Sequence, residues 1–144
     1  MNWLLLPAGG IALFIGLGIW SQKGEAEGLN GDRLSEPGDK PNVVCSEAGT
    51  QPERKVEPLE ADFSAVADAI EATGGTITAR SDDYLSATYM SQIFKFVDDV
   101  EIRRDDAITQ IRSASRVGYS DRGANRKRVE MIRAHLQSTS GSGA

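Results

Sequence analysis

The side chains best suited to chemistry in this sequence lie between residues 98 and 126. The adjacent carboxylates of Asp98 and Asp99 could act as an acid or a base, with Arg116 holding an anionic substrate beside them. The same region offers hydrogen-bond donors that suit an anion without any reaction, namely Arg112, Ser113, Ser115, Arg116, Asn125 and Arg126. The residue types therefore predict a ligand site here, and no residue is assigned a catalytic role.

A helix that begins near Asn125 would bring these donors together. We expect residues 113–116 to end a strand that leads through a turn into the last helix, where free backbone N–H groups favour an anion. In the alternative, Arg116 and Arg126 pair with carboxylates of the chain itself: Asp98, Asp99 or Glu101. Both interpretations remain open at this point.

Cysteine and histidine are too scarce for most metal and covalent chemistry. Cys45 is the only cysteine and His135 the only histidine. This excludes a disulfide framework and any Cys-rich or His-based metal site. We expect Cys45 to be a small buried side chain, and we predict no metal and no cofactor.

Basic side chains are concentrated near the C-terminus. Residues 1–111 carry 9 basic and 19 acidic side chains, a sum of −10, whereas residues 112–144 carry 7 basic and 2 acidic, a sum of +5. Such a patch could attract an anionic partner, or it could neutralise the acidic remainder of its own fold. Double-stranded nucleic acid is disfavoured, because the acidic part would repel it and no groove-reading motif is present.

The N-terminal residues have the composition of a membrane segment. Trp3 to Trp20 are 18 uncharged, mainly apolar positions, enough at about 1.5 Å per residue to cross most of a hydrocarbon core about 30 Å thick. Tryptophan at both ends suits the two interfaces. We expect residues 1–20 to be a transmembrane helix or signal anchor of a single-pass protein, with a cleaved secretory signal as the alternative. Lys23 and Arg33 would favour a cytoplasmic domain.

The rest of the chain divides into a folded part and two polar segments. Residues 21–41 are rich in Gly, Pro and charge and predict a flexible linker, and residues 138–144 predict a disordered tail. Residues 42–137 show helical spacing at 63–70 and 124–137, four strand-like runs between them, and a short edge strand at 43–45. We expect an α+β domain in which an antiparallel sheet of about four strands is covered by two helices.

Tight turns would place the apolar side chains of these strands on one face. A loop at residues 81–83 pairs Ile77 with Ala87, and two-residue turns at 91–92 and 105–106 join the later strands. In this register Phe94 and Phe96 belong to the apolar face.

The same register separates Asp98 from Asp99. Asp98 lies on the apolar face opposite Ser113, where it must be hydrogen bonded or protonated because a bare buried carboxylate costs several kcal/mol. The alternative is a bulge at residues 98–99 that turns it to solvent. Asp99 lies on the other face and forms an exposed ion pair with Arg112 on the next strand.

Several strings resemble one known family. IFKFVDDVEI and RSASRVGYSDRGANRKRVEMIR, with KPNVVCSE and KVEPL before them, resemble the domain-of-unknown-function family numbered fourteen ninety-nine, found in bacteria and chloroplasts. The resemblance spans residues 29–136 and implies no activity. Many members resemble exported lipoproteins or membrane-attached proteins, which implies a domain on the extracytoplasmic side. No cysteine comes directly after the apolar segment here, and Cys45 lies too far from it for a lipid anchor, so the segment itself would be the anchor.

These observations favour a binding protein over an enzyme. We expect a membrane-anchored domain that serves as a non-catalytic accessory or binding module for an anionic ligand or a protein partner. The alternative is an enzyme in which Asp98 or Asp99 is the acid or base and Arg116 binds an anionic substrate.

Overall fold

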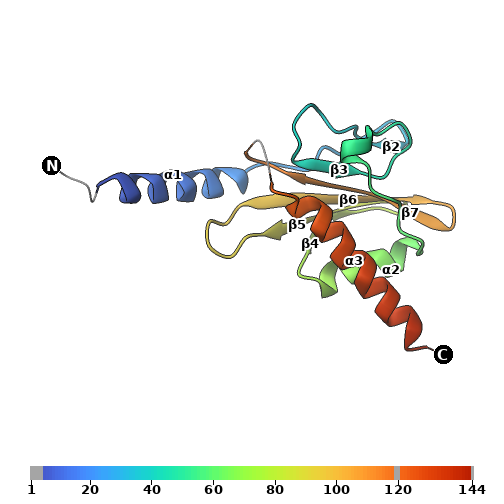
Figure 1. Ribbon diagram of the computed structural model, residues 1–144. Helices are drawn as coiled ribbons and strands as arrows, with labels where there is room; N and C mark the ends of the chain where they lie inside the picture. The colour runs from blue at the N-terminus through green and yellow to red at the C-terminus, as the bar shows by residue number, and fades with distance from the viewer. Residues whose placement is uncertain (1–4, 119–120, 144) are drawn as a thin grey trace.

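A five-stranded antiparallel sheet forms the centre of the computed structural model, which describes residues 5–118 and 121–143 (Figure 1). The strands lie in the order β3-β7-β6-β5-β4. Their bounds are β3 Val43–Cys45, β4 Thr76–Arg80, β5 Tyr84–Met90, β6 Val97–Asp105 and β7 Ile108–Ser115. The α+β class is thus confirmed, and the short strand at residues 43–45 is the fifth member of the sheet.

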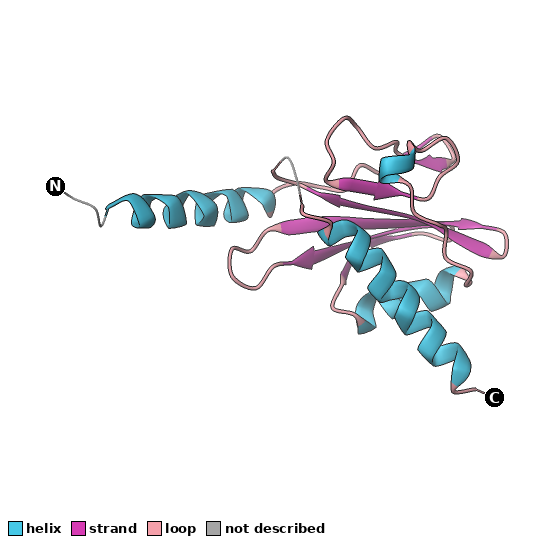
Figure 2. Ribbon diagram, viewed as in Figure 1, coloured by secondary structure: helices cyan, strands magenta, loops and turns pink. Residues whose placement is uncertain are grey.

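Two helices, α2 (Phe63–Ala72) and α3 (Ala124–Gly141), cover one face of the sheet (Figure 2). The α2 helix begins after Asp62, whose carboxylate accepts a hydrogen bond from the Ala65 N–H at 2.9 Å. The apolar core lies between the helices and the sheet and includes Phe63, Ile102 and Ile132. Because α3 continues to Gly141, residues 138–141 are helical, and the disordered tail expected at 138–144 is wrong for them.

Two of the three strand connections lie close to their expected places. Ile77 pairs with Ala87, as the sequence predicts, but a register shift between Ile77 and Ala79 pairs Ala79 with Ser86 instead of Leu85. Between β6 and β7, Asp105 pairs with Ile108, so the turn lies one residue later than expected and the register moves by two. A shift of two leaves every side chain on its face. Asp106 in this turn has a φ of 53°, a left-handed conformation that Asp tolerates.

The connection between β5 and β6 differs from the expected tight turn. Met90 pairs with Val97, so residues 91–96 form a loop. The rings of Phe94 and Phe96 leave the apolar face of the sheet and lie 5.3 Å and 6.4 Å from the ring of Phe14, centroid to centroid. These aromatic contacts with a distant helix take the place of the further strand pairs that local alternation predicts.

The second face of the sheet is covered by residues 22–34, which belong to the expected flexible linker. Here β1 (Leu29–Asn30) and β2 (Arg33–Leu34) form a small two-stranded sheet. The side chain of Leu34 is buried, and the Gly28 N–H donates a hydrogen bond of 2.7 Å to Glu101 Oε1. These contacts make the segment part of the fold rather than a tether.

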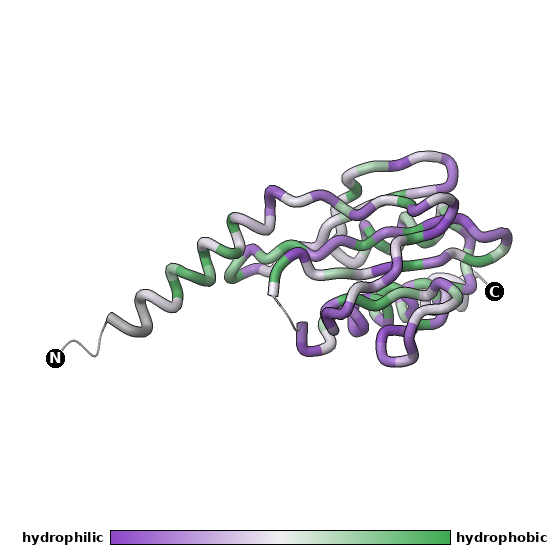
Figure 3. The backbone as a smooth tube through the Cα atoms, turned by 90° about the horizontal axis from the view of Figure 1, so that it is seen from above, coloured by the Kyte–Doolittle hydropathy of each residue, from purple (hydrophilic) through white to green (hydrophobic). Residues whose placement is uncertain are grey.

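The N-terminal helix α1 (Leu5–Ser21) projects from one end of the sheet (Figure 1). Figure 3 shows hydrophobic positions repeated along it, and the exposed ones include Ile11, Leu13, Phe14, Ile15, Ile19 and Trp20. Among the described residues, no helix is both long and apolar enough to cross a membrane. Trp3, expected at the other end of the segment, lies outside the described residues.

We predict that Leu34→Ala lowers the free energy of unfolding by about 2 to 5 kcal/mol, because it empties a fully buried site. Leu29→Ala in the neighbouring strand is the matched control and should lower it by less than about 1 kcal/mol, since Leu29 is 39% exposed. Urea denaturation of both variants measures the difference. Equal small losses would mean that the segment is a free linker after all.

Candidate functional site

The structure divides the predicted site residues between the two faces of the sheet. Side chains alternate along a strand, so Ser113 and Ser115 face α3, whereas Arg112 and Arg116 face the N-terminal segment. Arg126, on α3, donates to the backbone carbonyls of Lys55 and Glu53 at 2.8 Å and 2.9 Å. The donors therefore do not converge on one anion site.

Asn125 links three elements on the α3 face. Its side chain is fully buried and accepts a hydrogen bond of 2.6 Å from the Ser113 hydroxyl. Its Nδ2 donates to Ser115 Oγ at 2.9 Å, to the Asn42 carbonyl at 3.0 Å and to Asp121 Oδ2 at 2.7 Å. Asn125 thus joins α3 to β7 and to the start of β3, and these contacts are structural.

Asp98 also faces α3, as expected, but its partner is different. It pairs across the strands with Ser115 instead of Ser113, and its carboxylate lies 2.8 Å from Arg128 Nη2. The Arg128 guanidinium also lies 4.8 Å from the centre of the Tyr89 ring. Sequence reasoning missed Arg128, which precedes the buried Val129 on α3.

Asp99 faces the opposite side and is more buried than expected. Both of its oxygens accept hydrogen bonds of 2.7 Å from Arg116, and Arg116 Nη1 also donates to the Ser21 carbonyl at 3.0 Å. The hydrogen bonds from this guanidinium to Asp99 raise the pKa of Arg116 above its ordinary value. The expected pair of Asp99 with Arg112 is wrong, because the register places Arg112 opposite Glu101.

Glu101 and Arg112 form the most buried ion pair. Arg112 Nη1 donates to Glu101 Oε2 at 2.9 Å, and the Glu101 side chain is fully buried. The Tyr84 hydroxyl donates to Glu101 Oε1 at 2.7 Å, and burial together with this contact raises the pKa of Tyr84. Among the buried side-chain atoms described, Arg112 Nε lacks a hydrogen-bond partner.

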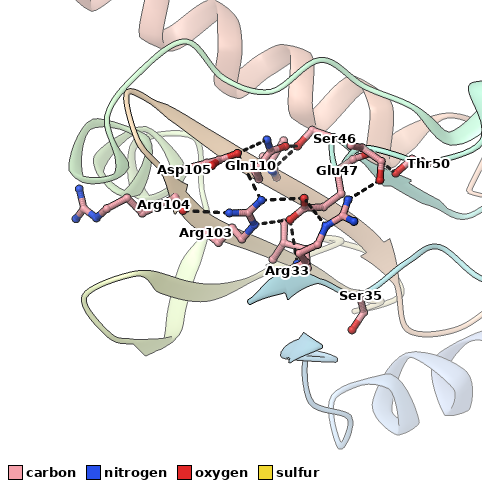
Figure 4. Close-up of polar contacts among 12 residues, drawn as sticks. Arg33, Ser35, Ser46, Glu47, Thr50, Arg103, Arg104, Asp105 and Gln110 are labelled. Atoms are coloured by element: carbon pink, nitrogen blue, oxygen red, sulfur yellow. Dashed lines mark hydrogen bonds and ion pairs between the residues drawn. The ribbon is translucent and has the colours of Figure 1, made fainter. Parts of the chain in front are cut away.

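A third ion pair continues this row at the other end of the sheet (Figure 4). Arg103 donates to both oxygens of Glu47, at 2.5 Å and 2.9 Å, and Arg33 donates to Glu47 Oε2 at 3.3 Å. The Leu34 N–H donates to Glu47 Oε1 at 3.0 Å. Burial alone would raise the pKa of Glu47, yet these hydrogen bonds, above all those from Arg103, hold it below its ordinary value.

Sequence reasoning missed Glu47 and Arg103, although a signal was present. Residues 99, 101 and 103 are all charged, and their spacing of two places them on the same face of β6. The three ion pairs hold the N-terminal segment against the sheet. The polar cluster is therefore structural, and it leaves both oxygens of Asp99 engaged with Arg116.

A groove of about 660 Å³ lies at the end of the sheet near α1. Its walls come from α1 (Phe14 and Leu17), from the end of β5 and the loop after it (Met90 and Phe96) and from α3 (Lys127 and Met131). The ion pair between Asp98 and Arg128 also lines it. This volume is in the usual range for small-molecule sites. The groove combines apolar walls with basic side chains of α3.

Residues 5–118 and 121–143, which the structure describes, contain neither a metal-binding cluster nor an exposed thiol. In these ranges no three His, Cys, Asp or Glu side chains are grouped so that they could hold a metal ion. Cys45 is buried as expected, and burial raises the pKa of its thiol. A neutral buried thiol is a poor nucleophile.

One comparison identifies relatives of this chain. The family model described as "Protein of unknown function (DUF1499)" matches residues 33–136. The match covers the five-stranded sheet, α2 and most of α3, and leaves out α1 and β1. It confirms the resemblance found in the residues. No curated protein and no solved structure gives a significant match.

We predict that Glu47→Gln lowers the free energy of unfolding at pH 7 by about 3 kcal/mol, because it leaves Arg103 without its buried counter-ion. The depressed pKa of Glu47 stabilises the fold above the unfolded-state pKa of about 4.3, and this stabilisation is lost as the pH falls through the folded-state value. The difference in free energy of unfolding between the wild type and Glu47→Gln should therefore become smaller as the pH is lowered.

Chemical denaturation between pH 7 and pH 3 measures this gap. Glu60→Gln is the matched control, since Glu60 is exposed, and it should change the stability little at any pH. A gap between wild type and Glu47→Gln that stays constant with pH would contradict the assignment.

Proposed function

Because the chain belongs to the DUF1499 family of proteins of unknown function, which supplies no activity, we propose from its own structure that it is a membrane-anchored binding module without catalytic activity. In this proposal α1 holds the chain in a membrane, and the groove beside α1 binds a ligand that has an apolar body and an anionic group. The single observation that carries it is the groove itself, which lies between an apolar helix and a basic one.

The exposed apolar surface of α1 supports the anchor. Leu13 is 62% exposed and Trp20 is 63% exposed, and apolar side chains point in several directions around the helix. A helix that is hydrophobic all round belongs in an apolar environment, and tryptophan favours the membrane interface. We place the anchor as a single pass and the domain on the extracytoplasmic side, as the family resemblance implies.

The walls of the groove support the choice of ligand. Phe14, Leu17 and Met131 offer apolar contact, whereas Lys127 is exposed at the groove. The first turn of α3 carries consecutive basic residues and no acidic one, which is the reverse of what a helix dipole favours. The Asp121 carboxylate already accepts hydrogen bonds from the Gly123 and Asn125 N–H groups at the start of α3. An anionic group of a ligand would therefore be held by the charge of Lys127.

The enzyme alternative has less support. Asp98 and Asp99 point to opposite faces of β6, so only Asp99 can share a site with Arg116. Both oxygens of Asp99 already accept hydrogen bonds from that arginine. Without a free carboxylate beside an anion-binding group, we favour binding over acid–base catalysis.

We predict that the full chain stays in the membrane pellet after an alkaline carbonate wash. Ile11→Lys combined with Ile15→Lys should release it into the wash, because each lysine near the middle of a bilayer costs about 3 kcal/mol. Leu29→Lys combined with Ala107→Lys adds the same charge at exposed positions of the domain and should not release it. Recovery of the wild-type chain in the wash would contradict the anchor.

We predict that a single-chain lipid with a phosphate head group binds in the groove more tightly than the same chain with a choline head group. Lys127→Glu should weaken binding of the phosphate form about tenfold, through loss of a charge-assisted contact. Lys40→Glu makes the same change of charge at an exposed site outside the groove and should leave binding unchanged.

Native mass spectrometry of the full chain, released from a non-ionic detergent, reads the occupancy by each lipid. Equal occupancy by the two head groups, or equal effects of the two lysine variants, would contradict the proposed ligand class.

A further inference from the structure

We propose that the loop at residues 91–96, between β5 and β6, enters the lipid bilayer beside α1 and forms a second attachment of the domain to the membrane. The partner is the interfacial and upper acyl region of the bilayer. This inference rests on the proposed anchoring by α1, and it adds a second membrane-binding surface to the one that α1 provides.

The loop presents apolar side chains to its surroundings. Ile93 is 80% exposed, and Met90, the last residue of β5 before the loop, is 51% exposed. Single exposed apolar residues are ordinary on a protein surface, so their exposure alone decides nothing. Ile93 precedes Phe94 in the chain, and Met90 lines the same groove as Phe96 and Phe14. The rings of Phe94, Phe96 and Phe14 contact one another, and Phe14 belongs to the exposed apolar surface of α1. A continuous apolar surface of this kind marks an interaction site.

The position of the loop along α1 sets its depth. The Phe94 ring lies 5.3 Å from that of Phe14, and a Cβ added to Gly18 would lie 1.6 Å from the Phe94 carbonyl oxygen. The loop therefore contacts α1 between Phe14 and Gly18. Phe14 precedes Trp20 by six residues, which is about 9 Å along an α-helix. With Trp20 at the membrane interface, the loop backbone at Gly18 lies about 3 Å below it along the helix, and the Phe94 ring beside Phe14 lies up to about 9 Å below it, within the region that interfacial elements reach.

Hydrogen bonds make the loop and helix one unit. The Val97 N–H donates to Ser21 Oγ at 3.1 Å, and the Ser21 hydroxyl in turn donates to the Gly18 carbonyl at 2.6 Å. Arg116 Nη1 donates to the Ser21 carbonyl at 3.0 Å, which ties the end of α1 to the sheet. The helix cannot enter the bilayer to its last turns while this contact lasts unless the loop goes with it.

The charges of the loop are compatible with a lipid surface. Between Met90 and Val97 there is no acidic residue, and Lys95 carries the only charge. A lysine at this depth can extend its ammonium group to the head groups, where it interacts favourably with anionic lipid.

Site-directed fluorescence on the full chain in vesicles of phosphatidylcholine and phosphatidylglycerol tests the proposal. A polarity-sensitive dye is attached at Ile93→Cys, and quenching is measured with lipids that carry a nitroxide on the upper acyl chain. Cys45 is fully buried and does not compete for the dye in the folded protein. Ala107→Cys, in the exposed turn between β6 and β7, is the matched control.

We expect blue-shifted emission and several-fold stronger quenching at position 93 than at position 107. A third label at Leu13→Cys separates the two proposals. Quenching at 13 without quenching at 93 would overturn the loop insertion and leave the anchor standing. Absence of quenching at both 13 and 93 would overturn the anchor and the loop insertion together.

Discussion

The buried ion pair between Glu101 and Arg112 is the constraint on which the arrangement of the N-terminal half depends. Removing two charges from water costs several kcal/mol per ion unless close contact and further hydrogen bonds offset it. The Tyr84 hydroxyl and the Gly28 N–H supply such bonds to the Glu101 carboxylate. Gly28 belongs to the segment that follows α1, so this segment has to lie across the sheet. Its path in turn fixes where α1 leaves the domain.

The sequence predicted the faces of the sheet well, because alternation depends only on parity. The registers between β5 and β6 and between β6 and β7 moved by even numbers of residues, so Ile102, Asp98 and Asp99 all kept their predicted faces. The sequence also predicted that Asp62 is the N-cap of α2, because an N-cap is a local interaction. Local periodicity and capping thus account for most of the domain between residues 42 and 137.

Contacts between distant segments were beyond such reasoning. The loop that carries Phe94 depends on contact with Phe14. The polar segment at 21–41 has the composition of a linker, yet its backbone N–H groups donate hydrogen bonds to the buried carboxylates of Glu101 and Glu47. The candidate site failed for the same reason: the donors are near one another along the chain, but alternation sends Arg116 and Ser115 to opposite faces. The groove appears only once α1 and α3 are placed in space.

The path of the N-terminal segment also determines the order in which the fold can be completed. A chain is synthesised from its N-terminus, yet Ser21 finds its partner Arg116 95 residues later, and Gly28 finds Glu101 73 residues later. Closing loops of this length is slow compared with forming hairpins and helices. The hairpins of β4 to β7 join neighbouring segments, whereas the N-terminal segment can take its place only after β6 and β7 have been synthesised.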